Sequence, residues 1–288
     1  MTKKGLEVLK AVIKQHGAGC IEQVIISHDR NVQKDYYAEL SALCKKNKIC
    51  FRDKAKKYTL RSKYALAVSW RWLIDAGSTK LIVFHDSILP KYRGFSPLVN
   101  MLINGEKKLG VSAIIAEKDY DTGPVLARKE MRAVYPLKIN DAIENVSGLY
   151  AELAVEVLGK IFSNKALAAV KQNEKKATYS LWRDEQDYRI DWSKSAEYIK
   201  RFTDSVGFPF KGAATKLEGR TVRILDAETE KDVVIENREP GKLIFIKNGC
   251  PVVVCGKGLL RITDMRDDQT EKQLLPFKKL RIRLGDNA

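Results

Sequence analysis

Hydrophobic and polar residues alternate with two different periods along the first 170 residues. Apolar residues that recur every three to four positions predict helices, and short β-branched runs between polar residues predict buried strands. Helices are expected at 3–16, 33–47, 96–104 and 139–162, and strands at 24–27, 64–69, 81–85 and 111–117. Strands that alternate with helices predict an α/β fold with a mostly parallel, doubly wound (Rossmann-like) sheet.

The pattern changes after about residue 205, where short strands are separated by turn residues, as in RTVRILDAE and PVVVCGKGLLRITDM. Such spacing predicts a small antiparallel β-barrel of OB-like type. Two domains are therefore expected, over 1–178 and 206–288, joined by a linker segment at 179–205.

The composition is that of an ordinary soluble globular protein, with 44% hydrophobic and 31% charged residues. No apolar run approaches the roughly 20 residues that span a bilayer, and the amino terminus has the pattern of an amphipathic helix rather than a signal peptide. A cytoplasmic protein without membrane partners is expected. The five cysteines form no CxxC pair, which argues against a disulfide framework and a zinc site and predicts reduced, mostly buried thiols.

The net charge is strongly positive, because 52 Lys and Arg residues stand against 36 Asp and Glu residues, giving +16. A positive charge of this size favours polyanions such as nucleic acid, a membrane surface or phosphorylated metabolites. The basic residues are scattered over several segments, so an ordinary solvated basic surface is an equal alternative.

A histidine and an aspartate each follow a predicted strand. His85 ends the apolar run 81–85, and the carboxyl ends of strands in open α/β sheets are where ligands bind. Asp121 follows the strand 111–117, so both side chains are expected at one edge of the sheet. An imidazole and a carboxylate together form a general acid/base pair. The alternatives are a structural histidine and an aspartate that only caps a turn. The sequence contains neither GxGxxG nor GxxxxGK[ST], the glycine-rich motifs that indicate a nucleotide-phosphate loop.

Two long motifs carry a family resemblance. HDSILPKYRGFSP, followed by GVSAIIAEKDYDTGPVL, resembles the signature of the folate-dependent formyltransferases, and ATYSLWRDEQDYRIDW is similar to the family's stretch that leads into the carboxyl-terminal barrel. The likeness extends from about residue 60 to 265. It implies an N-formyltransferase that moves a formyl group from 10-formyltetrahydrofolate to an amine without a metal.

The resemblance also implies roles for individual residues. His85 and Asp121 match the family's catalytic pair. The folate pocket would be formed by Ser69, Trp70, Trp72, Leu73, Asp119 and Tyr120. The acceptor substrate would be bound by Lys91, Tyr92, Arg93 and Gly94, with the two cations facing a diphosphate. An alternative of equal weight is that Trp70 and Trp72 are ordinary core residues that do not contact the folate.

Two features depart from the family pattern. Val83 stands where the family has a catalytic asparagine, and losing one oxyanion donor costs on the order of 100-fold to 1000-fold in rate. Either Asn100 or Ser87 supplies another donor, or the enzyme is weakened or repurposed. The family's first hydrophobic strand also has no counterpart before the helix at 3–16, which predicts unpaired sheet edges.

The acceptor amine has two main candidates. The basic insertion of methionyl-tRNA formyltransferases is replaced here by the short segment SHDRNVQKDYYAEL, which favours a nucleotide-linked amino sugar, although the charge of +16 fits tRNA. A folate- or nucleotide-binding relative without turnover and a nucleic-acid binder are further alternatives. The family likeness also implies a homodimer.

Overall fold

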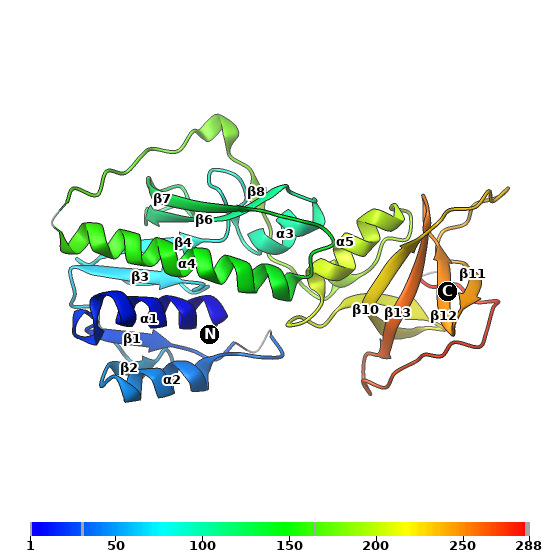
Figure 1. The fold of residues 1–288 in the computed structure, drawn as a ribbon, viewed down its shortest axis with the longest axis horizontal. Coiled ribbons are helices and arrows are strands. Elements are labelled where there is room, and N and C mark those ends of the chain that lie inside the picture. Colours follow the sequence, from blue (N-terminus) through cyan, green and yellow to red (C-terminus); the bar gives the residue numbers. More distant parts are fainter. Residues whose placement is uncertain (1, 30–31, 164, 286–288) are drawn as a thin grey trace. The chain divides into compact units, whose positions relative to one another are not determined.

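The computed structural model describes residues 2–29, 32–163 and 165–285 (Figure 1). The chain forms two compact units. The first contains 1–98, 107–133 and 141–182, and the second contains 99–106, 134–140 and 183–288. The chain therefore passes between the units more than once.

The main sheet of the first unit has four strands in the order β3-β4-β6-β7. These strands are β3 (Tyr64–Val68), β4 (Lys80–His85), β6 (Lys108–Ile115) and β7 (Val125–Arg132). Only β3 and β4 are parallel, whereas β6 is antiparallel to both β4 and β7. The prediction of a mostly parallel sheet is wrong for this half. A short connection with no helix joins β6 to β7, and such a connection suits antiparallel neighbours.

A separate parallel pair is formed by β1 (Gln23–Ile26) and β2 (Cys50–Asp53). The helix α2 (Tyr37–Lys46) connects them and begins four residues later than the expected 33–47. Neither β2 nor β7 was predicted, because their alternating polar residues hide the apolar face of a short strand.

Two helices of the first unit pack beside each other. In α1 (Lys3–His16), Leu6, Leu9 and Val12 are buried, as the amphipathic pattern predicts. Its last residue, His16, contacts Phe162 at the end of α4 (Ile139–Phe162) with ring centroids 5.1 Å apart. The ribbon shows α4 running along the main sheet (Figure 1).

A two-residue pair fixes the loop that follows β4. Within it, β5 (Arg93–Gly94) pairs in parallel with β8 (Tyr179–Ser180). Gly94 has a φ of +96°, and a Cβ there would lie 2.6 Å from the Ser180 carbonyl oxygen. The close approach of the two backbones therefore requires glycine. The short helix α3 (Pro97–Ile103) follows.

The second unit contains a five-stranded antiparallel sheet in the order β11-β12-β13-β10-β9. The strands are β9 (Ala213–Leu217), β10 (Arg220–Glu230), β11 (Leu243–Lys247), β12 (Cys250–Val254) and β13 (Leu259–Asp267). The helix α5 (Ala196–Val206) starts at Ser195, whose hydroxyl accepts from the Tyr198 N–H at 3.2 Å. The prediction of antiparallel strands is confirmed. The strand order has β9 and β11 as its two edges.

Cysteine exposure differs from expectation. All five cysteines are free, but only Cys44 and Cys255 are buried, and Cys20 and Cys50 are exposed. Within the described ranges, every helix is too short or too polar to cross a membrane.

Candidate active site

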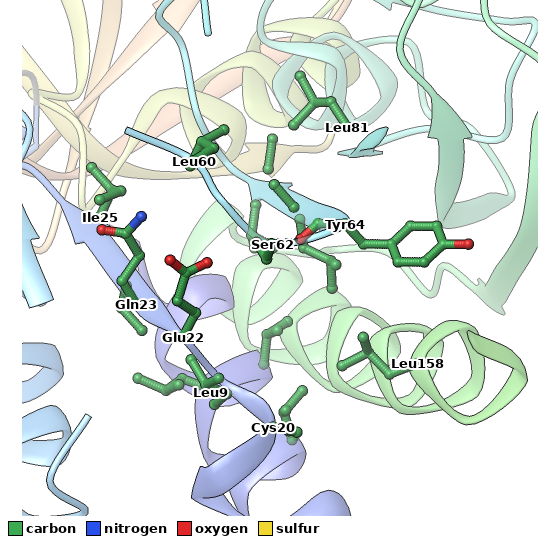
Figure 2. A pocket seen from close by; sticks show the side chains of 18 of the residues that line it. Leu9, Cys20, Glu22, Gln23, Ile25, Leu60, Ser62, Tyr64, Leu81 and Leu158 are labelled. Carbon is green, nitrogen blue, oxygen red and sulfur yellow. Dashed lines mark hydrogen bonds between the residues drawn. The ribbon is translucent and has the colours of Figure 1, made fainter. Parts of the chain in front are cut away.

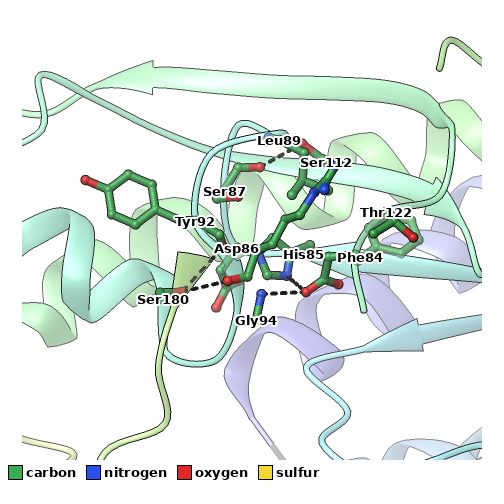
Figure 3. A network of polar contacts seen from close by, with 12 residues as sticks. Phe84, His85, Asp86, Ser87, Leu89, Tyr92, Gly94, Ser112, Thr122 and Ser180 are labelled. Atoms are coloured by element: carbon green, nitrogen blue, oxygen red, sulfur yellow. Dashed lines mark hydrogen bonds and ion pairs between the residues drawn. The ribbon is translucent and has the colours of Figure 1, made fainter. Parts of the chain in front are cut away.

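His85 is the last residue of β4 and its side chain is buried, with 7% exposed. Its Nε2 lies 2.7 Å from the carbonyl oxygen of Tyr92. A carbonyl only accepts hydrogen bonds, so this nitrogen carries a proton. The second ring nitrogen, Nδ1, makes a separate contact (Figure 3).

Asp121 meets that second nitrogen. Its Oδ2 lies 3.4 Å from His85 Nδ1 and accepts the Gly94 N–H at 2.8 Å. A proton on Nδ1 therefore has a carboxylate partner that fixes the orientation of the ring. Asp121 has a φ of +56°, a backbone conformation that aspartate tolerates better than most residues.

The structure brings His85 and Asp121 together for a different reason from the one expected. Because β6 is antiparallel to β4, its last residue Ile115 pairs with Ile82, away from the carboxyl end of β4. The connection between β6 and β7 returns Asp121 to the histidine. A buried side chain, Gln172, holds that connection, because its Nε2 donates to the carbonyl oxygens of Asp121 and Gly123, at 2.7 Å each.

Arg93 supports this arrangement through Gln172. Its side chain is fully buried, and its Nη2 donates to Gln172 Oε1 at 2.9 Å. Two further bonds of 2.7 Å run to the carboxylate of Glu174. The ion pair with Glu174 raises the pKa of the Arg93 guanidinium above its already high ordinary value. The guanidinium is therefore committed to Gln172 and Glu174, and Lys91 is the exposed cation of the loop.

The position of Val83 explains why it is apolar. It packs against Leu89, Ile114 and Val125, so an asparagine there would enter a hydrophobic cluster. Ser87 does not offer a free donor, since its hydroxyl donates to the Lys91 carbonyl at 2.6 Å. Asn100 belongs to the second unit, where its Oδ1 accepts from Arg183 at 3.2 Å. Both nitrogens of the His85 ring also have partners, the Tyr92 carbonyl for Nε2 and Asp121 for Nδ1, so an oxyanion would have to replace one of them to accept from the ring.

The residues expected to bind folate follow β3 or lie in the β6–β7 connection. Ser69 has a φ of +47°, which turns the chain sharply after β3. The rings of Trp70 and Trp72 meet edge to face at 5.0 Å, and Lys54 Nζ lies 4.4 Å from the Trp72 ring centroid. Leu73 is 85% exposed.

The other two expected folate residues lie close to Asp121. The carbonyl of Asp119 accepts from the Thr122 hydroxyl at 3.0 Å. Tyr120 is 64% exposed and its ring lies 6.0 Å from that of Phe95. Exposed apolar groups such as Leu73 and Tyr120 are candidates for covering a flat heterocycle.

A second polar group directly follows the histidine. The Asp86 carboxylate forms an ion pair with Lys4 and accepts a hydrogen bond from the Tyr150 hydroxyl, which also lies 3.2 Å from the Phe84 carbonyl oxygen. Burial raises the pKa of Asp86, but Lys4 and Tyr150 outweigh this and hold it below its ordinary value. Burial and the neighbouring Asp86 charge raise the pKa of Tyr150 well above 10.

A depressed carboxyl pKa predicts how stability depends on pH. The Asp86 contribution is present above the ordinary aspartate pKa of about 3.9 and is lost as the pH falls through the lower folded-state value. Thermal unfolding between pH 3 and 7 should therefore show wild type more stable than Asp86→Asn at pH 7, with the difference shrinking below about pH 4. For the exposed control Glu117→Gln we expect only a small difference at pH 7. A gap for Asp86→Asn that is as large at pH 3 as at pH 7 would contradict the prediction.

Sequence reasoning missed Gln172, Tyr150 and Lys4. Gln172 lies in a basic segment that resembles a solvated surface, and Lys4 lies in an amphipathic helix. Their partners are distant in sequence, so no local pattern identifies them. The only local signal was Asp86, a charge placed directly after the buried end of β4.

Two family models match this chain. The family model "Formyl transferase" matches residues 51–161, and "Formyl transferase, C-terminal domain" matches residues 183–275. A methionyl-tRNA formyltransferase from Dechloromonas aromatica is 31% identical over 198 residues, which are 67% of this chain and 60% of that protein. The chain thus spans less than two thirds of that relative's length.

Solved structures share the fold at lower identity. An N-formyltransferase from Helicobacter canadensis, in complex with folinic acid and dTDP-3-aminofucose, has a TM-score of 0.67 at 16% identity, covering 90% of this chain and 95% of its own. HypX from Aquifex aeolicus, in complex with tetrahydrofolic acid, has a TM-score of 0.62 at 17% identity, covering 88% of this chain and 45% of its own. The matches to both family models show that this chain belongs to the formyl transferase family.

Proposed function

We propose that this chain is an enzyme that transfers a formyl group from 10-formyltetrahydrofolate to the amine of a nucleotide-linked amino sugar. The observation that carries the proposal is the buried His85–Asp121 pair, with Nδ1 and Oδ2 3.4 Å apart at the end of β4. Membership in the formyl transferase family supports the reaction class.

The reaction requires a donor to an oxyanion and a route for one proton. The amine nitrogen attacks the formyl carbon, and the carbonyl oxygen becomes an oxyanion. Collapse re-forms the carbonyl, breaks the bond to the folate N10 atom and leaves a formamide and tetrahydrofolate, so the proton lost by the amine balances the one gained by N10. We assign the His85 imidazole to oxyanion stabilisation and proton transfer, and Asp121 to orienting it.

The remaining residues are assigned by position. Ser69, Trp70, Trp72, Leu73, Asp119 and Tyr120 would hold the folate, and the exposed aromatic and aliphatic groups among them suit a heterocycle. Lys91 supplies an exposed cation for a diphosphate, while the Tyr92 carbonyl and Gly94 N–H hold the catalytic pair. Arg93 acts through Gln172 rather than on substrate. Residues 1–178 would carry the catalytic domain, 179–205 the linker and 206–288 a barrel-like domain.

A nucleotide sugar is favoured as acceptor by the connection between β1 and α2. It runs only from residue 27 to 36, of which Arg30 and Asn31 lie outside the described residues. A connection of this length has few residues with which to contact a macromolecule. The Helicobacter canadensis N-formyltransferase bound to a dTDP-amino sugar is matched over 95% of its length, which also supports this choice.

Methionyl-tRNA is the second candidate, favoured by the relative at 31% identity and by the charge of +16.

The deciding experiment is a turnover assay with 10-formyltetrahydrofolate and a panel of nucleotide-linked 3-amino and 4-amino sugars, run beside methionylated tRNA. Mass spectrometry of a formylated sugar would support the proposal. Formylation of tRNA alone, steeply weakened by salt, would replace the acceptor. Folate binding without turnover on any acceptor would overturn the proposal that the chain is an enzyme. Light scattering tests the proposed homodimer.

A further inference from the structure

The first unit contains a large cavity that shares only Trp70 with the residues assigned to the folate. Its volume is about 710 Å³, and its walls come from β1, β3, α1 and α4 (Figure 2). Most lining side chains are apolar, including Leu9 and Val12 of α1 and Leu158 of α4. The charged lining residues Glu22, Lys63 and Lys165 are exposed, so they mark its solvent-facing rim. We call this cavity the strand slot.

The two long walls of the strand slot are strand edges. β1 ends the order of its two-stranded sheet and β3 ends the order of the four-stranded sheet, and both contribute lining residues along their length. Neither strand has a ladder partner on its slot side among the described residues. Two such edges on opposite sides of one cavity expose rows of donors and acceptors to the same space.

The hydrogen-bond alternation identifies which residues face the strand slot. The Lys80 N–H donates to the Lys63 carbonyl, so the odd-numbered residues of β3 bond with β4 and the backbones of Leu66 and Val68 point the other way. The Lys54 N–H donates to the Ile26 carbonyl, so Gln23 and Ile25 of β1 likewise face away from β2. In the described chain, the backbone N–H groups of these four residues have no partner on the slot side.

We propose that the strand slot binds an extended polypeptide segment of about five mainly apolar residues, which hydrogen-bonds to both edges. Five residues of strand span about 17 Å, and strands pair along their edges 4.7–4.9 Å apart. Small-molecule sites place a few convergent polar side chains in an apolar cavity. Here the polar groups are two rows of backbone, which match the alternating donors and acceptors of a third strand.

The test uses the whole chain with two peptides, acetyl-KIVVIVE-amide and the matched acetyl-KIVPIVE-amide, whose proline removes a central N–H. NMR-detected hydrogen exchange should show at least about tenfold slower exchange at Ile25, Leu66 and Val68 with the first peptide only. Ala65 and Ala67 face β4 and should be unchanged. This alternation between neighbouring residues is specific to strand addition.

A second measurement raises the effective concentration of the segment. The same two sequences are joined ahead of Met1 through a short glycine-serine linker, and thermal unfolding is recorded. A higher Tm for the valine sequence than for the proline sequence supports the proposal. Equal exchange and equal Tm with both sequences would overturn it. Binding of 1-anilinonaphthalene-8-sulfonate with no peptide protection would also overturn it and assign the cavity to small apolar molecules.

Discussion

Replacing His85 by asparagine is expected to lower kcat/KM for formyl transfer by on the order of 10²–10⁴-fold. The ring is the candidate oxyanion donor and proton carrier, and Val83 and Ser87 do not substitute for it, because one is apolar and the other donates to the Lys91 carbonyl. Asparagine keeps a polar side chain near the Tyr92 carbonyl but cannot exchange a proton near neutral pH. The measurement is steady-state formylation of the acceptor found in the turnover assay.

The matched control is His16→Asn. His16 ends α1, where its ring meets that of Phe162 with centroids 5.1 Å apart, and it is not among the residues assigned to the site. Its replacement should leave kcat/KM within about twofold. Because His85 is buried, folate binding and Tm are measured on both variants. An His85→Asn variant that folds, binds folate and keeps the wild-type rate would refute the assignment.

Replacing Gly123 by alanine is expected to have the largest effect on stability. A Cβ at this position would lie 1.7 Å from the Ile115 carbonyl oxygen and 3.0 Å from its carbonyl carbon. Both are backbone atoms of the last residue of β6, so no side-chain rotation relieves the overlap. We expect a loss of about 3 kcal/mol or more in the free energy of unfolding, which corresponds to a fall of roughly 6–12 °C in Tm.

Gly148→Ala is the control for this substitution. Gly148 lies in α4, and apart from its chain neighbours and its own helix backbone a Cβ added there would meet nothing within 4 Å, so alanine should stabilise the helix by about 0.5–1 kcal/mol. Gly123 is two residues from Asp121, so we also expect Gly123→Ala to lower the formylation rate by displacing the carboxylate. A Tm for Gly123→Ala within about one or two degrees of wild type would contradict the packing seen here.

Local patterns predicted the helices and the buried strands well. The expected helix at 3–16 coincides with α1, and the expected helix at 139–162 coincides with α4, because long apolar stripes at helical spacing have no competing interpretation. The strand at 81–85 was placed within one residue of β4. The motifs around His85 and Asp121 were sufficient to identify the family, which both family models then matched.

The sequence pattern could not predict the direction of the strands. The residues of β6 are apolar whichever way the strand runs, so the pattern could not show that β6 is antiparallel to β4. The half-polar β7 and β2 escaped detection because only one face of each is covered. Direction and pairing are set by which neighbours a strand meets, and those neighbours are distant in the chain.

The amino-acid sequence alone was sufficient to identify the family, the main helices and the two residues that carry the proposed chemistry. The folded chain was needed to show how Asp121 reaches His85, because that depends on Gln172 and Gly94 holding a connection that local pattern leaves free. It was also needed to show that Arg93 is buried against Glu174 and that β1 and β3 face a common cavity. Charge and hydropathy are local properties of a residue, whereas burial and partnership arise only when distant segments pack together.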